Sequence, residues 1–212
     1  MRDISSADRL IGSLDQAIRL VFGPRPHAER STPAVSVPES DLSAEERDLS
    51  GRLMRINHAG EICAQALYQG QALTARLEHV RDKMEQAAQE ENDHLAWTEE
   101  RVHELGSHTS YLNPVWYGGS FAIGAIAGLA GDRWSLGFLA ETERQVVEHL
   151  GEHLERLPAG DSRSRAILLQ MREDEGKHAT TAVESGGTPL PRPVQRLMRL
   201  TSRVMTRTAF WV

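Results

Sequence analysis

Apolar residues recur with the period of an α-helix along most of this chain, beginning close to its N-terminus. Residues 7–22 carry a first stripe, formed by Leu10, Ile11, Leu14, Ala17, Ile18, Val21 and Phe22. This spacing predicts an amphipathic helix whose apolar face either docks on a core or touches a membrane. The next segment, 23–40, contains four prolines and predicts a loose linker.

Helix start and stop signals divide the following part of the chain into two long helices. The run Ser43-Ala44-Glu45-Glu46 has the pattern of a capping box with Ser43 as the N-cap. It predicts a helix from about residue 43 to about His79. A second helix is expected over roughly 81–105, because Gly106 suits the position that follows a helix C-terminus.

Two further long helices are expected nearer the C-terminus. One covers about 134–157 and stops at Pro158, and the next begins at Asp161, which is a good N-cap. That helix ends near Gly186-Gly187, where a proline-rich turn begins. Between the two pairs of helices, residues 115–131 contain no charged residue. The length of this apolar segment is at the lower limit for a membrane-spanning helix.

The composition of the 212 residues fits one helical domain with a substantial core. Charged residues, at 25%, exclude wholesale disorder, and the acidic balance with few aromatic residues gives no support for nucleic-acid binding. Cys63 is the one cysteine, so no intrachain disulfide can form and a reducing compartment is expected. The first residues lack the long apolar core of a signal peptide.

The charge of the chain is unevenly distributed. Residues 188–212 contain five arginines and no acid, so with a total of −6 the remainder carries −11. The arginines recur every three or four positions, at Arg192, Arg196, Arg199, Arg203 and Arg207. Such a basic amphipathic helix suits an anionic membrane surface, and the alternative is a helix docked on the acidic body of the same protein.

The chemistry of the chain is carried by a pattern that occurs twice. Glu91 and His94 form one Glu-x-x-His pair, and Glu175 and His178 form another. A lone glutamate precedes each pair: Glu61 comes 30 residues before Glu91, and Glu143 comes 32 residues before Glu175. On a helix, positions i and i+3 share a face, so each pair directs a carboxylate and an imidazole the same way.

Four antiparallel helices would bring these six side chains to one point. A helix of about 26 residues plus a short turn accounts for each spacing, and places the lone glutamate level with the pair on its neighbour. Four carboxylates and two imidazoles are the ligand set of di-iron and di-manganese bundles. Ligands rich in oxygen and free of sulfur suit iron or manganese better than zinc or copper.

A third Glu-x-x-His pair, Glu100 and His103, is expected to be a solvated surface pair. Glu100 follows Glu91 by nine residues, which is a rotation of roughly 180° around the helix, and no matching glutamate lies upstream.

The two pairs expected to bind metal, Glu91/His94 and Glu175/His178, also constrain the apolar segment 115–131. Because this segment separates the early donors from the late donors, a single membrane crossing would leave them on opposite sides of the bilayer.

The predicted fold is therefore all-α: a ferritin-like four-helix bundle over 43–187, in which the apolar segment is a crossover helix. This helix either packs on the bundle or dips into one leaflet. A region with an amphipathic helix and a linker, 1–42, precedes the bundle, and a basic amphipathic helix, 188–212, follows it as a membrane-facing tail.

The segment from Leu53 to Glu61, which ends in Asn57-His58-Ala59-Gly60-Glu61, resembles the N-H-A-G-E signature of the demethoxyubiquinone hydroxylases. These proteins are membrane-associated di-iron monooxygenases of ubiquinone biosynthesis. The resemblance covers roughly 50–187 and rests on motifs in the same order: Ala66–Gln71, Glu91–His94, the apolar crossover, Ala140–Glu143 and Asp174–His178.

The resemblance implies a ligand set and a reaction. Glu61 and His94 would bind one iron ion, Glu143 and His178 would bind the other, and Glu91 and Glu175 would bridge both. The reaction would be the O₂-dependent hydroxylation of the ring of a polyprenylated demethoxybenzoquinol. Its reducing equivalents would derive ultimately from NADH. The chain has no Rossmann-type glycine motif and so no nicotinamide-binding fold, which makes this supply indirect.

The expected location is the cytoplasmic face of a bacterial inner membrane, where the protein would be peripheral. Expected partners are the membrane-resident polyprenyl quinol and an anionic membrane surface; other ubiquinone-biosynthesis proteins and further copies of the chain stay open as partners. Two other functions share parts of the pattern. One is a ferritin-like iron oxidase or peroxide-scavenging di-iron protein, and the other is a metal-stabilised scaffold of a membrane complex.

Overall fold

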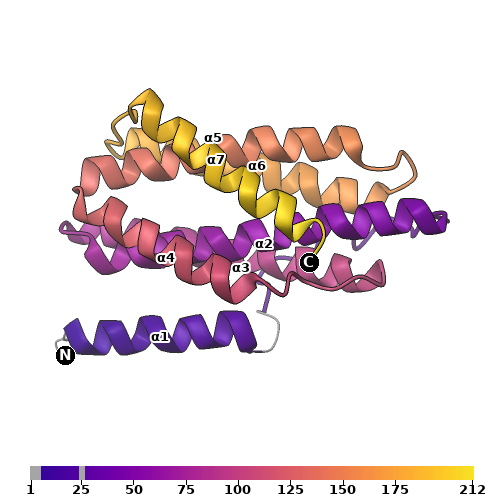
Figure 1. Cartoon of the computed structure of the whole chain (residues 1–212), viewed down its shortest axis with the longest axis horizontal. Coiled ribbons are helices and arrows are strands. Elements are labelled where there is room, and N and C mark those ends of the chain that lie inside the picture. Colours follow the sequence, from indigo (N-terminus) through magenta and orange to yellow (C-terminus); the bar gives the residue numbers. More distant parts are fainter. Residues whose placement is uncertain (1–5, 24–26) are drawn as a thin grey trace.

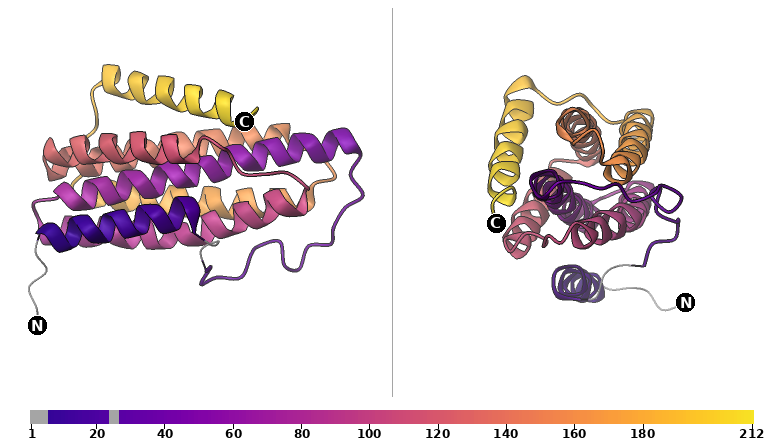
Figure 2. Two further views of the ribbon diagram at one scale, coloured as in Figure 1. Left: turned by 60° about the horizontal axis from the view of Figure 1, so that its bottom comes forward. Right: turned by 90° about the vertical axis from the view of Figure 1, so that its right-hand side faces the viewer.

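The computed structural model describes residues 6–23 and 27–212 (Figure 1). Residues 1–5 and 24–26 of the expected N-terminal region, and the side chain of Leu10 in its stripe, lie outside the described part. Regular structure in the described residues consists of seven α-helices without a strand, which confirms the all-α class. The helices α2, α3, α5 and α6 lie side by side as a bundle, while α1, α4 and α7 lie on its outside (Figure 2).

The four core helices largely follow the expected boundaries: α2 is Ala44–Thr74, α3 is Glu78–Glu104, α5 is Asp132–Arg156 and α6 is Ser162–Glu184. The capping box is present, because the Ser43 hydroxyl accepts a hydrogen bond from the Glu46 backbone N–H and the Glu46 carboxylate accepts one from the Ser43 N–H. Asp161 caps α6 by accepting from the Ser164 N–H. Gly106 ends α3 at φ +70°, where a side chain would be strained.

One helix end was predicted wrongly. The first core helix stops at Thr74, not near His79, because the chain turns through 75–77 before α3 begins. The carboxylate of Asp132, at the start of α5, accepts hydrogen bonds from the backbone N–H groups of Arg76 and Leu77, at 3.0 and 2.9 Å. These bonds provide acceptors for the backbone N–H groups of the turn, and the acceptor residue, Asp132, lies more than fifty residues away in the sequence.

The crossover helix α4, Asn113–Leu129, packs along α2. A Cβ atom on Gly124 would collide with the backbone of Leu67, and one on Gly128 would collide with Thr74. On the α2 side, a Cβ atom on Gly70 would meet the backbone of Phe121. The glycines therefore let two helix backbones approach closely. No helix of the described residues is both long and apolar enough to cross a membrane.

The outer helices α1, Ser6–Phe22, and α7, Arg192–Ala209, each bury only part of their surface. Ala17 and Val21 of α1 pack near Phe121, whereas Ile11, Ile18 and several neighbours remain exposed. Helix α7 packs mainly on α2, where Ala209 is fully buried. Its C-terminal end is fixed further by the Arg52 guanidinium, which lies 4.8 Å from the ring of Trp211.

Two apolar clusters fill the bundle at different levels. The first includes Leu53, Met54, Trp97, Val102, Leu150, Leu154, Leu168 and Met171. The second includes Tyr68, Met84, Leu136, Leu139 and Ala182. On every core helix the six expected ligand positions fall between the residues of the first cluster and those of the second. The polar layer is thus enclosed between two water-excluding layers of the core.

Candidate metal centre

The structure brings all six expected ligands together in that polar layer. Their donor atoms form two groups, each with all atoms within 4.8 Å of one another: Glu61, Glu91, His94 and Glu175 form one group, and Glu91, Glu143, Glu175 and His178 form the other. Glu91 and Glu175 belong to both. The early donors of α2 and α3 therefore meet the late donors of α5 and α6, as the repeated pattern required.

The two Glu-x-x-His pairs are related by a crossed arrangement. His94 Nδ1 lies 2.8 Å from Glu91 Oε2 in its own motif and 3.0 Å from Glu175 Oε1 in the other. His178 Nδ1 lies 3.2 Å from both Glu175 Oε2 and Glu91 Oε1. Both imidazoles therefore direct Nδ1 at the same two central carboxylates.

The third pair lies elsewhere, as the helical rotation predicted. Glu100 is exposed, and the side chain of His103 is 59% exposed with its nearest carboxylate in Glu99. Neither residue belongs to the two groups of donors.

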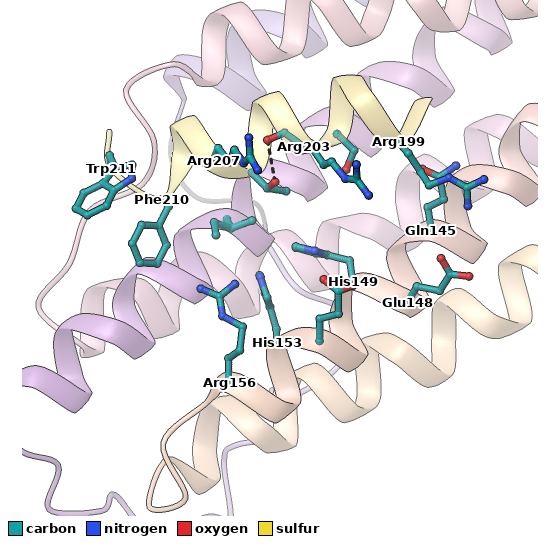
Figure 3. Close-up of a pocket in the computed structure, with 14 residues that line it drawn as sticks. Gln145, Glu148, His149, His153, Arg156, Arg199, Arg203, Arg207, Phe210 and Trp211 are labelled. Carbon is teal, nitrogen blue, oxygen red and sulfur yellow. Dashed lines mark hydrogen bonds between the residues drawn. The ribbon is translucent and has the colours of Figure 1, made fainter. Parts of the chain in front are cut away.

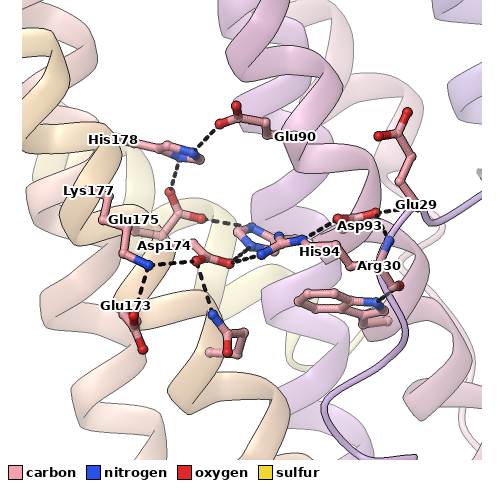
Figure 4. A network of polar contacts seen from close by, with 12 residues as sticks. Glu29, Arg30, Glu90, Asp93, His94, Glu173, Asp174, Glu175, Lys177 and His178 are labelled. Atoms are coloured by element: carbon pink, nitrogen blue, oxygen red, sulfur yellow. Dashed lines mark hydrogen bonds and ion pairs between the residues drawn. The ribbon is translucent and has the colours of Figure 1, made fainter.

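Two acids that the sequence analysis missed hold the outer nitrogens of the imidazoles (Figure 4). His94 Nε2 lies 3.2 Å from Asp174 Oδ2 on α6, and His178 Nε2 lies 2.8 Å from Glu90 Oε2 on α3. Each acid thus serves the histidine of the opposite motif. The sequence does mark these acids, because each one immediately precedes the glutamate of a Glu-x-x-His pair, in Glu90-Glu91 and Asp174-Glu175. Such outer partners fix the ring orientation of metal-binding histidines.

Arg30, from the segment before α2, holds one of these acids. Its Nη1 lies 2.8 Å from Asp174 Oδ2, and its Nε lies 2.5 Å from Asp93 Oδ2 on α3. The guanidinium also lies 4.8 Å from the ring centroid of Trp97. This arginine joins α3 to α6 beside His94, and no local pattern in the linker marked it.

Burial and mutual charge set the protonation of the six side chains. Burial raises the pKa of Glu61 and of Glu143 well above the usual value; the Glu91 charge adds to the rise for Glu61, and the Glu175 charge adds to it for Glu143. Burial lowers the pKa of His178, but its hydrogen bonds to Glu175 and Glu91 outweigh that effect and raise the pKa to about 12. The pKa of His94 is likewise raised, against burial, chiefly by the Glu91 charge.

Glu91 and Glu175 behave in the opposite way. Burial raises the pKa of each, but hydrogen bonds and charges from the imidazoles lower both pKa values below the usual range. Two ionised carboxylates thus face two imidazolium groups, and the other two carboxyls keep their protons. Without metal ions, these bound protons compensate the negative charge of the carboxylates, which cations would compensate in a metal centre.

The cluster is suited to metal ions by its donors. The Glu143 Oε1 atom is buried without a hydrogen-bond partner among the described residues. Buried carboxylates with such a free oxygen are costly unless a cation or proton meets them. This buried set of carboxylates and imidazoles can bind metal ions, and its oxygen-rich chemistry suits iron or manganese.

Comparison with known proteins agrees with this geometry. The family model described as "Ubiquinone biosynthesis protein COQ7" matches residues 48–209, which is most of the chain. The chain belongs to the COQ7 family. A relative from Nitrosococcus oceani is 61% identical over 211 residues, covering 100% of this chain and 99% of its own.

Other relatives are similar over nearly their whole length. One from Nitrosomonas eutropha is 58% identical and covers 98% of this chain and 99% of its own, and one from Acinetobacter baumannii is 55% identical and covers 100% of both. All three relatives are named 3-demethoxyubiquinol 3-hydroxylase. The resemblance that the motifs indicated is confirmed.

In this COQ7-family chain, a cavity of about 430 Å³ reaches the centre between α3 and α6. Its inner wall includes His178, Leu139 and Ala182, and its rim carries charged residues such as Glu90 and Lys177. The His178 side of the centre is therefore open to this cavity. His94 has no exposed surface and does not line it.

Proposed function

We propose that this protein is a 3-demethoxyubiquinol 3-hydroxylase that uses two iron ions and O₂. The observation that carries the proposal is the pair of overlapping donor groups that share Glu91 and Glu175. In this assignment Glu61 and His94 bind one iron ion, Glu143 and His178 bind the other, and the two shared carboxylates bridge them. Two bound iron ions would supply O₂ reduction, with one oxygen entering the quinol ring and the other leaving as water.

The side chains of the chain have three tasks in this reaction. The apolar clusters above and below the site exclude bulk water. Asp174 and Glu90 keep both histidines turned with Nδ1 towards the centre. Glu90, which is partly exposed at the rim of the cavity, lies where protons can pass between solvent and the neighbourhood of His178.

The decisive experiment supplies demethoxyubiquinol and ¹⁸O₂ to the reduced, iron-loaded protein. The expected product is the hydroxylated quinol with one ¹⁸O atom on the ring, at a yield that depends on the reductant supplied. Turnover without hydroxylated product, with ferric mineral or peroxide consumption alone, would establish the iron oxidase or peroxide-scavenging alternative instead. Metal analysis of the same sample reports whether two iron ions are bound per chain.

We propose further that the protein reaches its polyprenyl substrate by lying on an anionic membrane from its cytoplasmic side. Exposed apolar side chains on three outer helices support this: Ile11, Leu14, Ile18 and Phe22 on α1, Val115 and Ile126 on α4, and Leu197, Leu200 and Val204 on α7. The three helices lie on adjoining sides of the bundle (Figure 2). Contiguous exposed apolar surface commonly marks a contact with a membrane or partner.

The membrane proposal is tested by replacing two exposed leucines of α7. In Leu197→Asp/Leu200→Asp, binding to vesicles of phosphatidylcholine and phosphatidylglycerol is expected to fall by about tenfold or more, since two apolar side chains are replaced by anions. Thr201→Asp, compared with Leu200→Asp alone, places the same charge on an exposed polar position of the same helix. Equal losses in both variants would mean that charge alone, and not the apolar face, governs binding.

A further inference from the structure

A groove of about 360 Å³ lies between α5 and α7, and none of the six metal-site residues lines it (Figure 3). Helix α7 bridges this space because it is fixed near both ends. Near its start, the Gln145 side chain donates a hydrogen bond to the Gln195 carbonyl, and near its end, Arg55 donates one to the Phe210 carbonyl. The middle of α7 is thus held away from α5, with an open groove below it.

Four arginines line this groove. Arg199, Arg203 and Arg207 follow one another at intervals of four along α7, so they share a face of the helix, and Arg156 comes from the end of α5. The sequence predicted this cationic stripe, but the structure turns three of its members towards α5. Among the described residues, neither Arg203 nor Arg207 forms an ion pair with an acid.

The acids of the groove leave it with a cationic excess. Glu148 and Glu152 of α5 also line it, but Glu148 already pairs with Arg144 outside the groove. Helix α7 contains no acid. Four guanidinium groups therefore face two carboxylates, one of which is already neutralised.

Two histidines of α5 form the inner wall without adding charge. Burial lowers the pKa of His149 to about 4 and that of His153 to about 2, so both are neutral near pH 7. The Nε2 atom of each is buried without a hydrogen-bond partner among the described residues. His153 Nδ1 lies 2.9 Å from the side-chain amide oxygen Oδ1 of Asn57 and donates to it, so the Nε2 atom carries a lone pair without a partner.

We propose that the groove between α5 and α7 is a binding site for a phosphate group. Planar guanidinium groups pair with phosphate oxygens through two parallel hydrogen bonds, and several around one groove favour a compact dianion over chloride. This site is separate from the metal centre, and its binding requires neither iron nor quinol.

The phosphate can belong to a lipid headgroup or to a soluble phosphate compound. On α7 the arginine face lies beside the exposed face of Leu200 and Val204. If that apolar face rests in a membrane, the arginines lie near the depth of the headgroups. The two sources share one chemistry, so the experiment must separate them.

The test measures inorganic phosphate binding to the full-length protein by titration calorimetry at constant ionic strength. Saturable binding at one site per chain is expected, and Arg203→Ala or Arg207→Ala should weaken it by about tenfold or more. Arg203→Lys keeps the charge but loses the planar fork, so an intermediate loss is expected. Arg196→Ala is the matched control, because Arg196 is an exposed arginine of the same helix that does not line the groove.

A variant that binds phosphate more tightly shows that the changes in affinity are not caused by damage to the fold. Glu152→Gln removes an acid from the groove and should tighten phosphate binding by about two- to threefold. Absence of saturable binding, or an equal loss in Arg196→Ala and Arg203→Ala, would overturn the proposal.

Vesicles then identify the source. The site is assigned to a headgroup if two results are obtained with phosphatidylcholine vesicles that contain phosphatidic acid. Arg203→Ala must lose more vesicle binding than Arg196→Ala does, and free phosphate must compete with vesicle binding of the unaltered protein. Equal vesicle binding of the two variants, together with the calorimetric difference, assigns it to a soluble phosphate compound.

Discussion

The two halves of the metal centre come from matching sequence motifs but differ in their surroundings. His94 has no exposed surface, and Asp174, which holds it, is 10% exposed and is itself fixed by Arg30 and Gln170. The side chain of His178 is 14% exposed, and Glu90, which holds it, is 44% exposed with Gln86 as a further partner. The His94 half is braced and its imidazole is closed off, although Asp174 and Arg30 line the cavity; in the open half, His178 itself lines that cavity.

Matching ligands of the two motifs therefore lie in unlike surroundings, and we expect them to contribute differently to the centre. The braced half keeps a fixed geometry, because both ring nitrogens of His94 contact carboxylates and Asp174 is held in turn by Arg30 and Gln170. The open half can exchange protons and small molecules with solvent, because Glu90 and His178 both line the cavity and Glu90 is partly exposed.

The shared carboxylates should matter equally to both halves. Glu91→Ala or Glu175→Ala removes a residue that belongs to both donor groups, so we expect hydroxylation to be abolished and iron content to fall to one ion per chain or fewer. Iron analysis and product assays measure this. Glu100→Ala, in the Glu-x-x-His pair that lies outside the centre, is the control and should keep two iron ions. Full iron content in both bridging variants would refute the shared role.

The outer acids should separate the halves. Asp174→Ala leaves the Nε2 atom of a fully buried imidazole without its partner, and should weaken iron binding by about 10- to 100-fold. Glu90→Ala should weaken it by less than about threefold, because water can replace a half-exposed carboxylate. Competition with a chelator measures both affinities. If the two losses are equal, the contrast between a braced and an open half is wrong.

Removal of the metals should make stability sensitive to alkaline pH. The folded protein holds a proton on His178 up to a pH of about 12, whereas an unfolded histidine loses it near 6.5. The folded state thus binds more protons across that window, and its stability falls as pH rises; the raised pKa values of His94, Glu61 and Glu143 act in the same direction.

Thermal unfolding of the chelated protein measures this effect. We expect its Tm to fall by roughly 5 °C or more between pH 6.5 and 9, with a flatter profile after iron is restored. His178→Gln should flatten the profile of the chelated protein, because the titrating imidazole is removed. Identical slopes with and without iron would contradict the proton balance described for the centre.

Local rules predicted much of this molecule because they depend on neighbours in the sequence. The capping box at Ser43, the N-cap at Asp161 and the stop at Gly106 were all confirmed, since each is made by residues within a few positions of one another. The meeting of Glu61, Glu91 and their counterparts was also foreseeable, because helical period and helix length fix which positions face inward at one level.

Other features depended on residues far apart in the chain, and no local pattern contained them. Asp132 ended α2 early through hydrogen bonds across more than fifty residues. Arg30 reached Asp174 across the bundle, and the arginines of α7 turned towards α5. The side chains that could form a metal centre were identifiable from the amino-acid sequence, because the geometry of a helix repeats along the chain. Tertiary packing alone decided that one half of it is closed and the other open, because burial depends on which segments cover a surface.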